Sequence, residues 1–312
     1  MKLAFIFPGQ GAQKVGMGRA LYDASKAARA CFEEADAALG EPLGTLIFEG
    51  PQEKLTLTAN TQPSILTVSV AAYRTLRELT DAVPDFVAGH SLGEFSALVA
   101  SGAMSFADAV RTTRARGSFM QEAVPTGQGA MAAIMNKSPE EIADACARQA
   151  SGEVVSPANF NAPGQIVVSG HAAAVKRVCD DLAAGGARVI PLAVSAPFHC
   201  ALMAPAARGL AKVLEGVRFA DPRPPVVTNV EAAPNADGSR VADLLVRQVV
   251  SPVRWTDSVR FMLDAGVTTF VELGPGNVLA GLVRRIERSA TVVSVDTPKA
   301  AEEAARLLKG NT

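Results

Sequence analysis

The chain has 312 residues, of which 48% are hydrophobic and 20% charged, so it can bury a large core without disulfides or metal ions. Its 30 basic and 31 acidic residues give a net charge of -1, which provides no overall field to attract nucleic acid or anionic lipid. The composition therefore predicts an ordinary globular protein with neither kind of partner.

The cysteines and the apolar segments indicate the setting in which the protein acts. The chain has four cysteines, without a CxxC pair: Cys31, Cys146, Cys179 and Cys200. This spacing argues against a zinc site and a disulfide framework, so we expect no bound metal and a reducing, cytoplasmic setting. The apolar run at residues 3–7 is cut by Pro8 and is too short for a signal peptide, and no later segment is long enough to span a bilayer.

The first predicted element is a buried strand at residues 3–7, followed by a glycine-rich loop at residues 8–13. A dinucleotide fingerprint would need a third glycine where Lys14 stands, and no GxxxxGK[ST] motif lies nearby. We therefore expect the loop to offer a backbone amide, such as that of Gln10, to an oxyanion rather than to hold a phosphate.

Two helical segments follow, at residues 17–39 and 64–79. The polar residues 58–63 come directly before the second helix, so Gln62 is predicted to lie on a loop. Its side chain either faces a cleft or is solvated.

Residues 86–100 have the pattern of a strand, a tight turn and a helix, with Gly-His-Ser-Leu-Gly at the turn. Glycines on either side of Ser91 allow such a turn and push the serine side chain out of the backbone, so Ser91 is the candidate nucleophile. The amide of Leu92 and the positive end of the helix would stabilise an oxyanion. The alternative is an ordinary turn in which Ser91 only caps the helix.

Residues 105–108 have the spacing of a capping box and open a helix that runs to about residue 123. On this helix Arg116 lies about 60° from the centre of the apolar stripe, Arg114 about 100° and Arg111 about 160°. Only Arg116 is therefore expected to face the interior, either as a paired structural residue or as the group that holds an anionic substrate.

The pattern then changes to strand, helix, strand, strand, helix, strand, at residues 130–136, 138–149, 154–159, 165–169, 172–184 and 187–193. This is the order of a ferredoxin-like unit. We expect residues 124–194 to form this small subdomain, inserted into a large domain made of residues 1–123 and 195–312. The amide-rich loop at residues 159–164 is expected to approach the active site.

The chain has three histidines, and His199 is the candidate general base. His171 begins a predicted helix, and His90 is expected to point away from Ser91. A structural role for His199 remains the alternative. Further strands at residues 225–229 and 267–273 complete an α/β fold: a large, α/β-hydrolase-like domain with a mostly parallel sheet and the inserted βαββαβ subdomain.

Eight short motifs occur in order along the chain: FPGQGAQ at 7–13, QP at 62–63, GHSLGE at 89–94, RGxxM at 116–120, NFNxPGQ at 159–165, PxH at 197–199, QxxxPVxW at 248–255 and ELGPG at 272–276. Each motif alone is weak, but the ordered set is specific and covers nearly the whole chain. In these motifs the sequence resembles the malonyl-CoA:acyl carrier protein transacylase family, of the free-standing type that serves bacterial fatty-acid synthesis.

The resemblance implies a malonyl transfer through a malonyl-serine intermediate on Ser91, with His199 as its base, and it implies no cofactor besides coenzyme A as product. The Gln248 backbone carbonyl would orient His199, so we expect the Gln248 side chain to matter little. The amides of Gln10 and Leu92 would form the oxyanion hole. The substrate would be bound by Arg116, which holds its carboxylate, and by Gln62, Met120, Asn159, Asn161 and Phe198.

Malonyl-CoA and an acyl carrier protein would be the partners of a monomeric enzyme. Three alternatives stay open: a serine thioesterase or hydrolase, an acyltransferase of polyketide synthesis or malonate decarboxylation, and a non-catalytic binding subunit. A hydrolase usually has an acid between its serine and its histidine in sequence. The acids in that interval, Asp144, Asp180 and Asp181, all lie on predicted helices.

Overall fold

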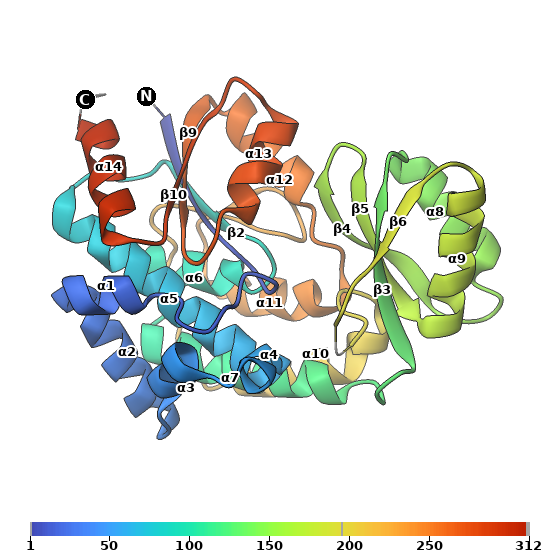
Figure 1. The fold of residues 1–312 in the computed structure, drawn as a ribbon, viewed down its shortest axis with the longest axis horizontal. Helices are drawn as coiled ribbons and strands as arrows, with labels where there is room; N and C mark the ends of the chain where they lie inside the picture. Colours follow the sequence, from blue (N-terminus) through green and yellow to red (C-terminus); the bar gives the residue numbers. More distant parts are fainter. Residues whose placement is uncertain (1, 195, 310–312) are drawn as a thin grey trace.

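The computed structural model describes residues 2–194 and 196–309, and Figure 1 shows two sheets that stand side by side. The larger sheet has the strand order β10-β9-β1-β2-β7-β8. All neighbouring strands are parallel except β7 and β8, so the mostly parallel sheet is confirmed. Its strands are β1 (Lys2–Phe7), β2 (Phe86–Gly89), β7 (Val226–Val227), β8 (Pro234–Asn235), β9 (Val267–Leu273) and β10 (Thr291–Val295).

Helices cover both faces of this sheet. Alternate residues of β1 enter two different cores: Phe5 and Phe7 pack with the helices on one face, and Ala4 and Ile6 with those on the other. The helices are α1 (Arg19–Ala24), α2 (Lys26–Leu39), α3 (Leu43–Glu49), α4 (Gln52–Thr56), α5 (Thr58–Leu79), α6 (Gly93–Ala100), α7 (Phe106–Glu122), α10 (Ala204–Leu214), α11 (Val241–Val250), α12 (Trp255–Asp264), α13 (Val278–Ile286) and α14 (Pro298–Lys309), with 3₁₀ turns η1 (Ala201–Met203) and η2 (Gly238–Arg240).

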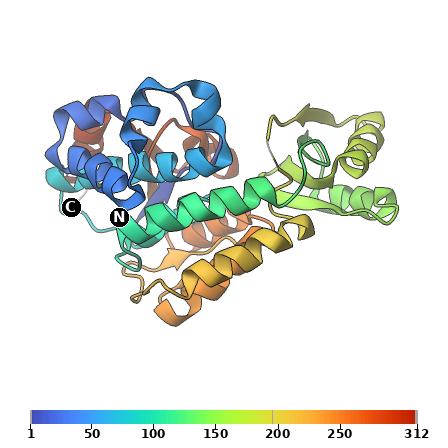
Figure 2. The same ribbon diagram turned by 90° about the horizontal axis from the view of Figure 1, so that it is seen from below.

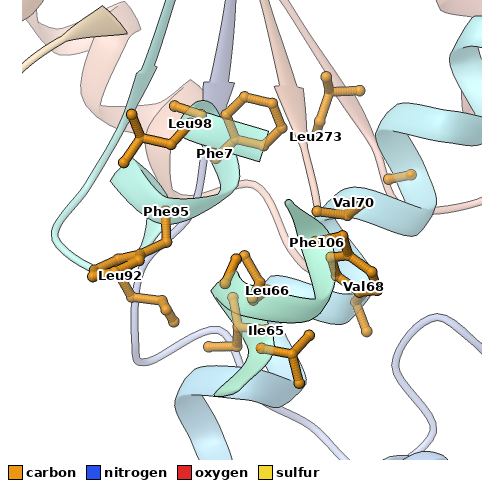
Figure 3. Close-up of a cluster of buried hydrophobic side chains, with 14 of the residues drawn as sticks. Phe7, Ile65, Leu66, Val68, Val70, Leu92, Phe95, Leu98, Phe106 and Leu273 are labelled. Carbon is orange, nitrogen blue, oxygen red and sulfur yellow. The ribbon is translucent and has the colours of Figure 1, made fainter. Parts of the chain in front are cut away.

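The first core holds the helix that follows the serine turn. Figure 3 shows Leu98 beside Phe7 at the end of β1, Phe95 and Leu92 below this pair, and Leu66 and Ile65 of α5 in the lower part of the same cluster. Phe7, Phe95 and Ile65 are fully buried. The start of α6 is therefore fixed by close packing against the carboxyl end of the central strand.

The second sheet belongs to a four-stranded antiparallel subdomain. Its order is β4-β5-β3-β6, and it has its own hydrophobic core, so the ferredoxin-like unit is confirmed. Its elements are β3 (Gly129–Met135), α8 (Pro139–Gln149), β4 (Val155–Ala162), β5 (Gln165–His171), α9 (Ala172–Ala184) and β6 (Arg188–Pro191). The boundaries at residues 124 and 194 stay a prediction, and Ser195 lies outside the described residues.

Helix α7 joins the two parts of the molecule. Figure 2 shows it running from the large part toward the small subdomain beside α10, and β3 follows it in the chain. Ser105 caps its start, as predicted, by accepting a hydrogen bond from the Asp108 amide. No helix in the described ranges has both the length and the apolar character needed to cross a membrane.

The predicted helix at residues 17–39 is wrong at Ser25. This residue has extended backbone (φ -114°, ψ 129°), and its side chain accepts from the Ala28 amide at 3.0 Å. It therefore ends α1 and caps the start of α2.

The predicted loop at residues 58–63 is also wrong, because α5 already begins at Thr58 and contains Pro63. Its polar side chains bond the preceding backbone: Asn60 donates to the Lys54 carbonyl and Thr61 to the Leu55 carbonyl, both at 2.7 Å. Polar residues that normally indicate a loop are thus satisfied inside a helix.

The predicted loop at residues 159–164 is a strand over most of its length, since β4 continues to Ala162 and only two residues turn into β5. Gly164 has a φ of 68°, which suits glycine in such a tight turn. Two register shifts in the β4–β5 pairing explain why the alternating pattern of a strand was not visible there.

Candidate active site

The turn that carries Ser91 is held by close backbone contacts. A Cβ on Gly89 would lie 1.9 Å from the Gly93 carbonyl, and a Cβ on Gly93 would lie 2.1 Å from the Phe7 carbonyl oxygen. Only glycine fits at both positions. Ser91 itself has a φ of 51°, a strained value for a non-glycine residue. This is the geometry of a nucleophile elbow at the carboxyl end of β2.

Ser91 and His199 are in direct contact. The Ser91 Oγ lies 2.7 Å from His199 Nε2, and His199 Nδ1 lies 2.9 Å from the backbone oxygen of Gln248. Because a carbonyl oxygen can only accept, Nδ1 carries the proton and the lone pair of Nε2 faces the serine hydroxyl. Burial, with the nearby charge of Arg116, lowers the pKa of His199 to about 3, so the ring is neutral at physiological pH and able to accept a proton.

The group that orients the imidazole is a carbonyl rather than a carboxylate. The acids Asp180 and Asp181 instead form ion pairs with Lys176 and Arg148 on the outer helices of the small subdomain. The Ser-His-acid arrangement of a typical serine hydrolase is therefore not built from these residues.

Arg116 enters the site from α7 and is 1% exposed. Its Nη1 donates to Gln62 Oε1 at 2.8 Å, and its Nη2 donates to Gln248 Oε1 at 2.9 Å and to Ser91 Oγ at 3.2 Å. Its Nε is buried without a hydrogen-bond partner in the described part of the chain. Burial lowers the pKa of Arg116 to about 10, opposed by the charge of Glu94, so the guanidinium remains charged at neutral pH.

The other two arginines of α7 are less buried than Arg116 and do not line the cavity. The side chain of Arg111 is 53% exposed and pairs with Asp108, and Arg114 contacts Glu41 and Asn60. The prediction that only Arg116 points inward is confirmed.

The Gln248 side chain, which is predicted to matter little, makes several hydrogen bonds within the site. Its Oε1 accepts from Arg116, and its Nε2 donates to Glu94 Oε2 at 2.8 Å and to the Ser91 carbonyl at 3.1 Å. The side chain thus joins the serine turn to the arginine.

Glu94 and Asn229 are two site residues that the sequence reasoning missed. The Asn229 Oδ1 accepts from the Ser91 amide at 2.6 Å, and the Asn229 amide donates to Glu94 Oε2 at 3.0 Å. Glu94 is 2% exposed, and burial raises its pKa to about 7. The sequence does contain an indication for Glu94, because a glutamate in the first turn of an apolar helix must be either exposed or paired with a polar group.

The predicted oxyanion hole is made of the amides of Gln10 and Leu92. Both residues line the cavity that contains Ser91, and Leu92 directly precedes α6. Neither amide donates a hydrogen bond to another of the described residues. Two free donors and a helix N-terminus next to a nucleophile can stabilise a developing negative charge.

The cavity has a volume of about 450 Å³. Gln62, Met120, Asn159 and Phe198 line it, together with Met131 and Val194. Gln62 therefore faces the cleft and is not solvated, since its side chain bonds Arg116 and lies 3.6 Å from the Met120 sulfur.

Asn161 is not brought into the cavity wall. Its Oδ1 lies 2.8 Å from Nε2 of His90, which lines the cavity, whereas Asn161 is not among the lining residues. The ring of His90 also packs near that of Trp255. Asn161 is thus placed to hold the serine turn against β4 rather than to contact a substrate.

Comparison with known proteins gives consistent matches over the whole chain. The model of the acyl transferase domain family matches residues 4–307. The chain is 47% identical to the malonyl CoA-acyl carrier protein transacylase of Bacillus subtilis (99% of this chain, 98% of the relative) and 48% identical to that of Escherichia coli K12 (98% and 99%).

Solved structures also match nearly the whole chain. The malonyl CoA-acyl carrier protein transacylase of Coxiella burnetii superposes with a TM-score of 0.97 at 40% identity, over 99% of this chain and 98% of that one. A malonyl-transacylase solved in complex with a type II polyketide acyl carrier protein gives a TM-score of 0.96 at 45% identity, over 98% and 100%.

Proposed function

We propose, from the premise that the chain belongs to the malonyl CoA-acyl carrier protein transacylase family, that it transfers the malonyl group of malonyl-CoA to the phosphopantetheine thiol of an acyl carrier protein. The product would supply fatty-acid synthesis. In the same proposal the enzyme is monomeric and acts in the cytoplasm.

One observation carries the choice of substrate. The Arg116 guanidinium is buried and lies 3.2 Å from the Ser91 Oγ. In a malonyl thioester the carboxylate is separated from the attacked carbonyl carbon by a single methylene. A cation this close to the nucleophile therefore suits a short dicarboxylic acyl group, which a planar guanidinium can bind with two parallel hydrogen bonds.

The contacts support a two-step reaction. His199 Nε2 takes the proton from Ser91 Oγ, which attacks the thioester carbonyl, and the carbon–sulfur bond breaks as the proton passes to the departing thiolate of coenzyme A. The thiol of the carrier protein then gives its proton to His199 and attacks the malonyl-serine ester. Ser91 recovers its proton as the malonyl-carrier thioester leaves. The amides of Gln10 and Leu92 would hold the oxyanion in both steps.

The test is intact-mass measurement after mixing the protein with malonyl-CoA. We expect a malonyl adduct that peptide mapping places on Ser91, that is absent from Ser91→Ala, and that disappears on addition of carrier protein in its phosphopantetheine form. An adduct of equal size on Ser91→Ala would refute the assignment. Loss of the adduct in water at the same rate with and without carrier would favour a hydrolase.

Docking of an acidic carrier protein is predicted to depend on Arg285 and Arg288, two exposed residues in the last turn of α13 and just after it. Arg285 donates to Gln165 of β5 at 2.7 Å and so joins α13 to the small subdomain. Three other basic residues are less suited: Arg177 and Arg284 bond backbone carbonyls, and Lys176 lies on the outer helix α9.

Charge reversal of Arg285 and Arg288 should raise the apparent KM for the carrier protein at low salt and leave acylation by malonyl-CoA unchanged. Lys176→Glu is the matched control. Steady-state kinetics at two ionic strengths measure the effect, and carrier kinetics equal to those of the control would place the docking surface elsewhere.

A further inference from the structure

Gln248 is the residue at which the parts of the site meet. Its backbone oxygen contacts His199 Nδ1, its Nε2 donates to the Ser91 carbonyl, and its Oε1 accepts from Arg116 Nη2. The side chain is fully buried. A small shift of this residue would therefore move the arginine relative to the serine and its base.

The side-chain amide of Gln248 works in one orientation only. If the two ends of the amide were exchanged, its NH₂ group would face the Arg116 cation and its oxygen would face the Ser91 carbonyl. A donor would then meet a donor and an acceptor would meet an acceptor, so neither end would form a hydrogen bond. Something must hold the NH₂ end in place. The shortest contact of that end is with Glu94 Oε2, at 2.8 Å.

Glu94 is built into the fold as a fixed acceptor. It lies in the first turn of α6, three residues after Ser91. The same oxygen that accepts from Gln248 also accepts from the Asn229 amide at 3.0 Å. Removing this oxygen would take the acceptor from the buried Asn229 amide and leave the Gln248 NH₂ group with only its longer contacts, to the Ser91 carbonyl and Asn229 Oδ1, so the groups attached to both donors would be free to shift.

We propose that Glu94 is a positioning residue for malonyl selection: it holds the Gln248 amide in the orientation that presents Oε1 to Arg116, and so places the guanidinium for the substrate carboxylate. This inference rests on the proposed function. It assigns to Glu94 no contact with the substrate, and it requires an acceptor oxygen at that position rather than a negative charge.

The experiment compares Glu94→Gln with Glu94→Leu. Glutamine can place its amide oxygen where Oε2 lies and so keep both donors satisfied, whereas leucine of similar size cannot. For Glu94→Leu we expect kcat/KM with malonyl-CoA to fall about 10- to 100-fold, mostly through KM, while acetyl-CoA changes much less. Glu94→Gln should keep the malonyl-to-acetyl ratio of the wild type. Gln248→Leu should reproduce the loss of selectivity.

The matched control is Glu272→Leu. Glu272 is likewise a buried carboxylate that accepts two hydrogen bonds from amides, those of Leu279 and Ala280, but it lies on β9 and holds the start of α13. We expect this variant to lose stability, measured by thermal unfolding, without a change in the malonyl-to-acetyl ratio.

An unchanged ratio in Glu94→Leu or in Gln248→Leu would overturn the inference, and so would a loss in Glu94→Gln as large as in Glu94→Leu. If the leucine variant does not fold, Glu94→Asp, whose carboxylate is retracted by one methylene, replaces it with the same expected direction. A failure of the proposed function can be distinguished from a failure of this inference, because in the first case the wild type would form no malonyl adduct on Ser91.

Discussion

His199→Ala is expected to slow both acylation by malonyl-CoA and transfer to the carrier protein by about 10²- to 10⁴-fold each, the usual contribution of a general base. The reason is that one imidazole, 2.7 Å from the Ser91 Oγ, serves both steps. It removes the proton from the attacking oxygen or sulfur and returns it to the group that leaves. Rapid-quench measurement of the adduct follows each half-reaction separately.

His90→Ala is the control for His199→Ala, since His90 is the other histidine in the cavity wall and its ring bonds Asn161 rather than Ser91. We expect it to affect both steps much less. If His199→Ala slowed only one half-reaction, the proton in the other would have to travel through a different group. If both kept wild-type rates, His199 would be structural.

The parts of the site that could be predicted from the sequence are those that local rules determine. The Gly-x-Ser-x-Gly turn requires glycine at two positions for reasons of space, and helical periodicity alone separates Arg116 from Arg111 and Arg114. The fold class follows from the alternation of strands and helices along the chain.

The parts that could not be predicted are side-chain contacts between distant segments. Glu94 and Gln248 are 154 residues apart in the chain, and no local pattern says that their side chains meet. Polar residues and Pro63 predict a loop at Gln62, whereas buried hydrogen bonds to the preceding backbone allow a helix there. Such networks depend on tertiary packing.

Arg116→Ala should invert the preference of the enzyme between malonyl-CoA and acetyl-CoA. The malonyl carboxylate must leave water to reach Ser91, and removal of one member of a buried charge pair typically costs about 2 to 5 kcal/mol. We therefore expect kcat/KM for malonyl-CoA to fall by roughly 30- to several-thousand-fold. Acetyl-CoA has no carboxylate, and in the wild type it leaves the buried guanidinium without an anion. The variant should use acetyl-CoA as well as before or better.

The measurement is kcat/KM for both thioesters in the wild type, in Arg116→Ala and in Arg111→Ala, with circular dichroism to confirm folding. Arg111 lies on the same helix but is exposed and paired with Asp108, so its variant should keep the wild-type preference. Arg116→Lys should recover little, because an ammonium group cannot make the two parallel bonds to a carboxylate. If kcat/KM fell equally for both substrates in Arg116→Ala, the arginine would only support Gln62 and Gln248. The malonyl carboxylate would then have to be bound by another group in the cavity.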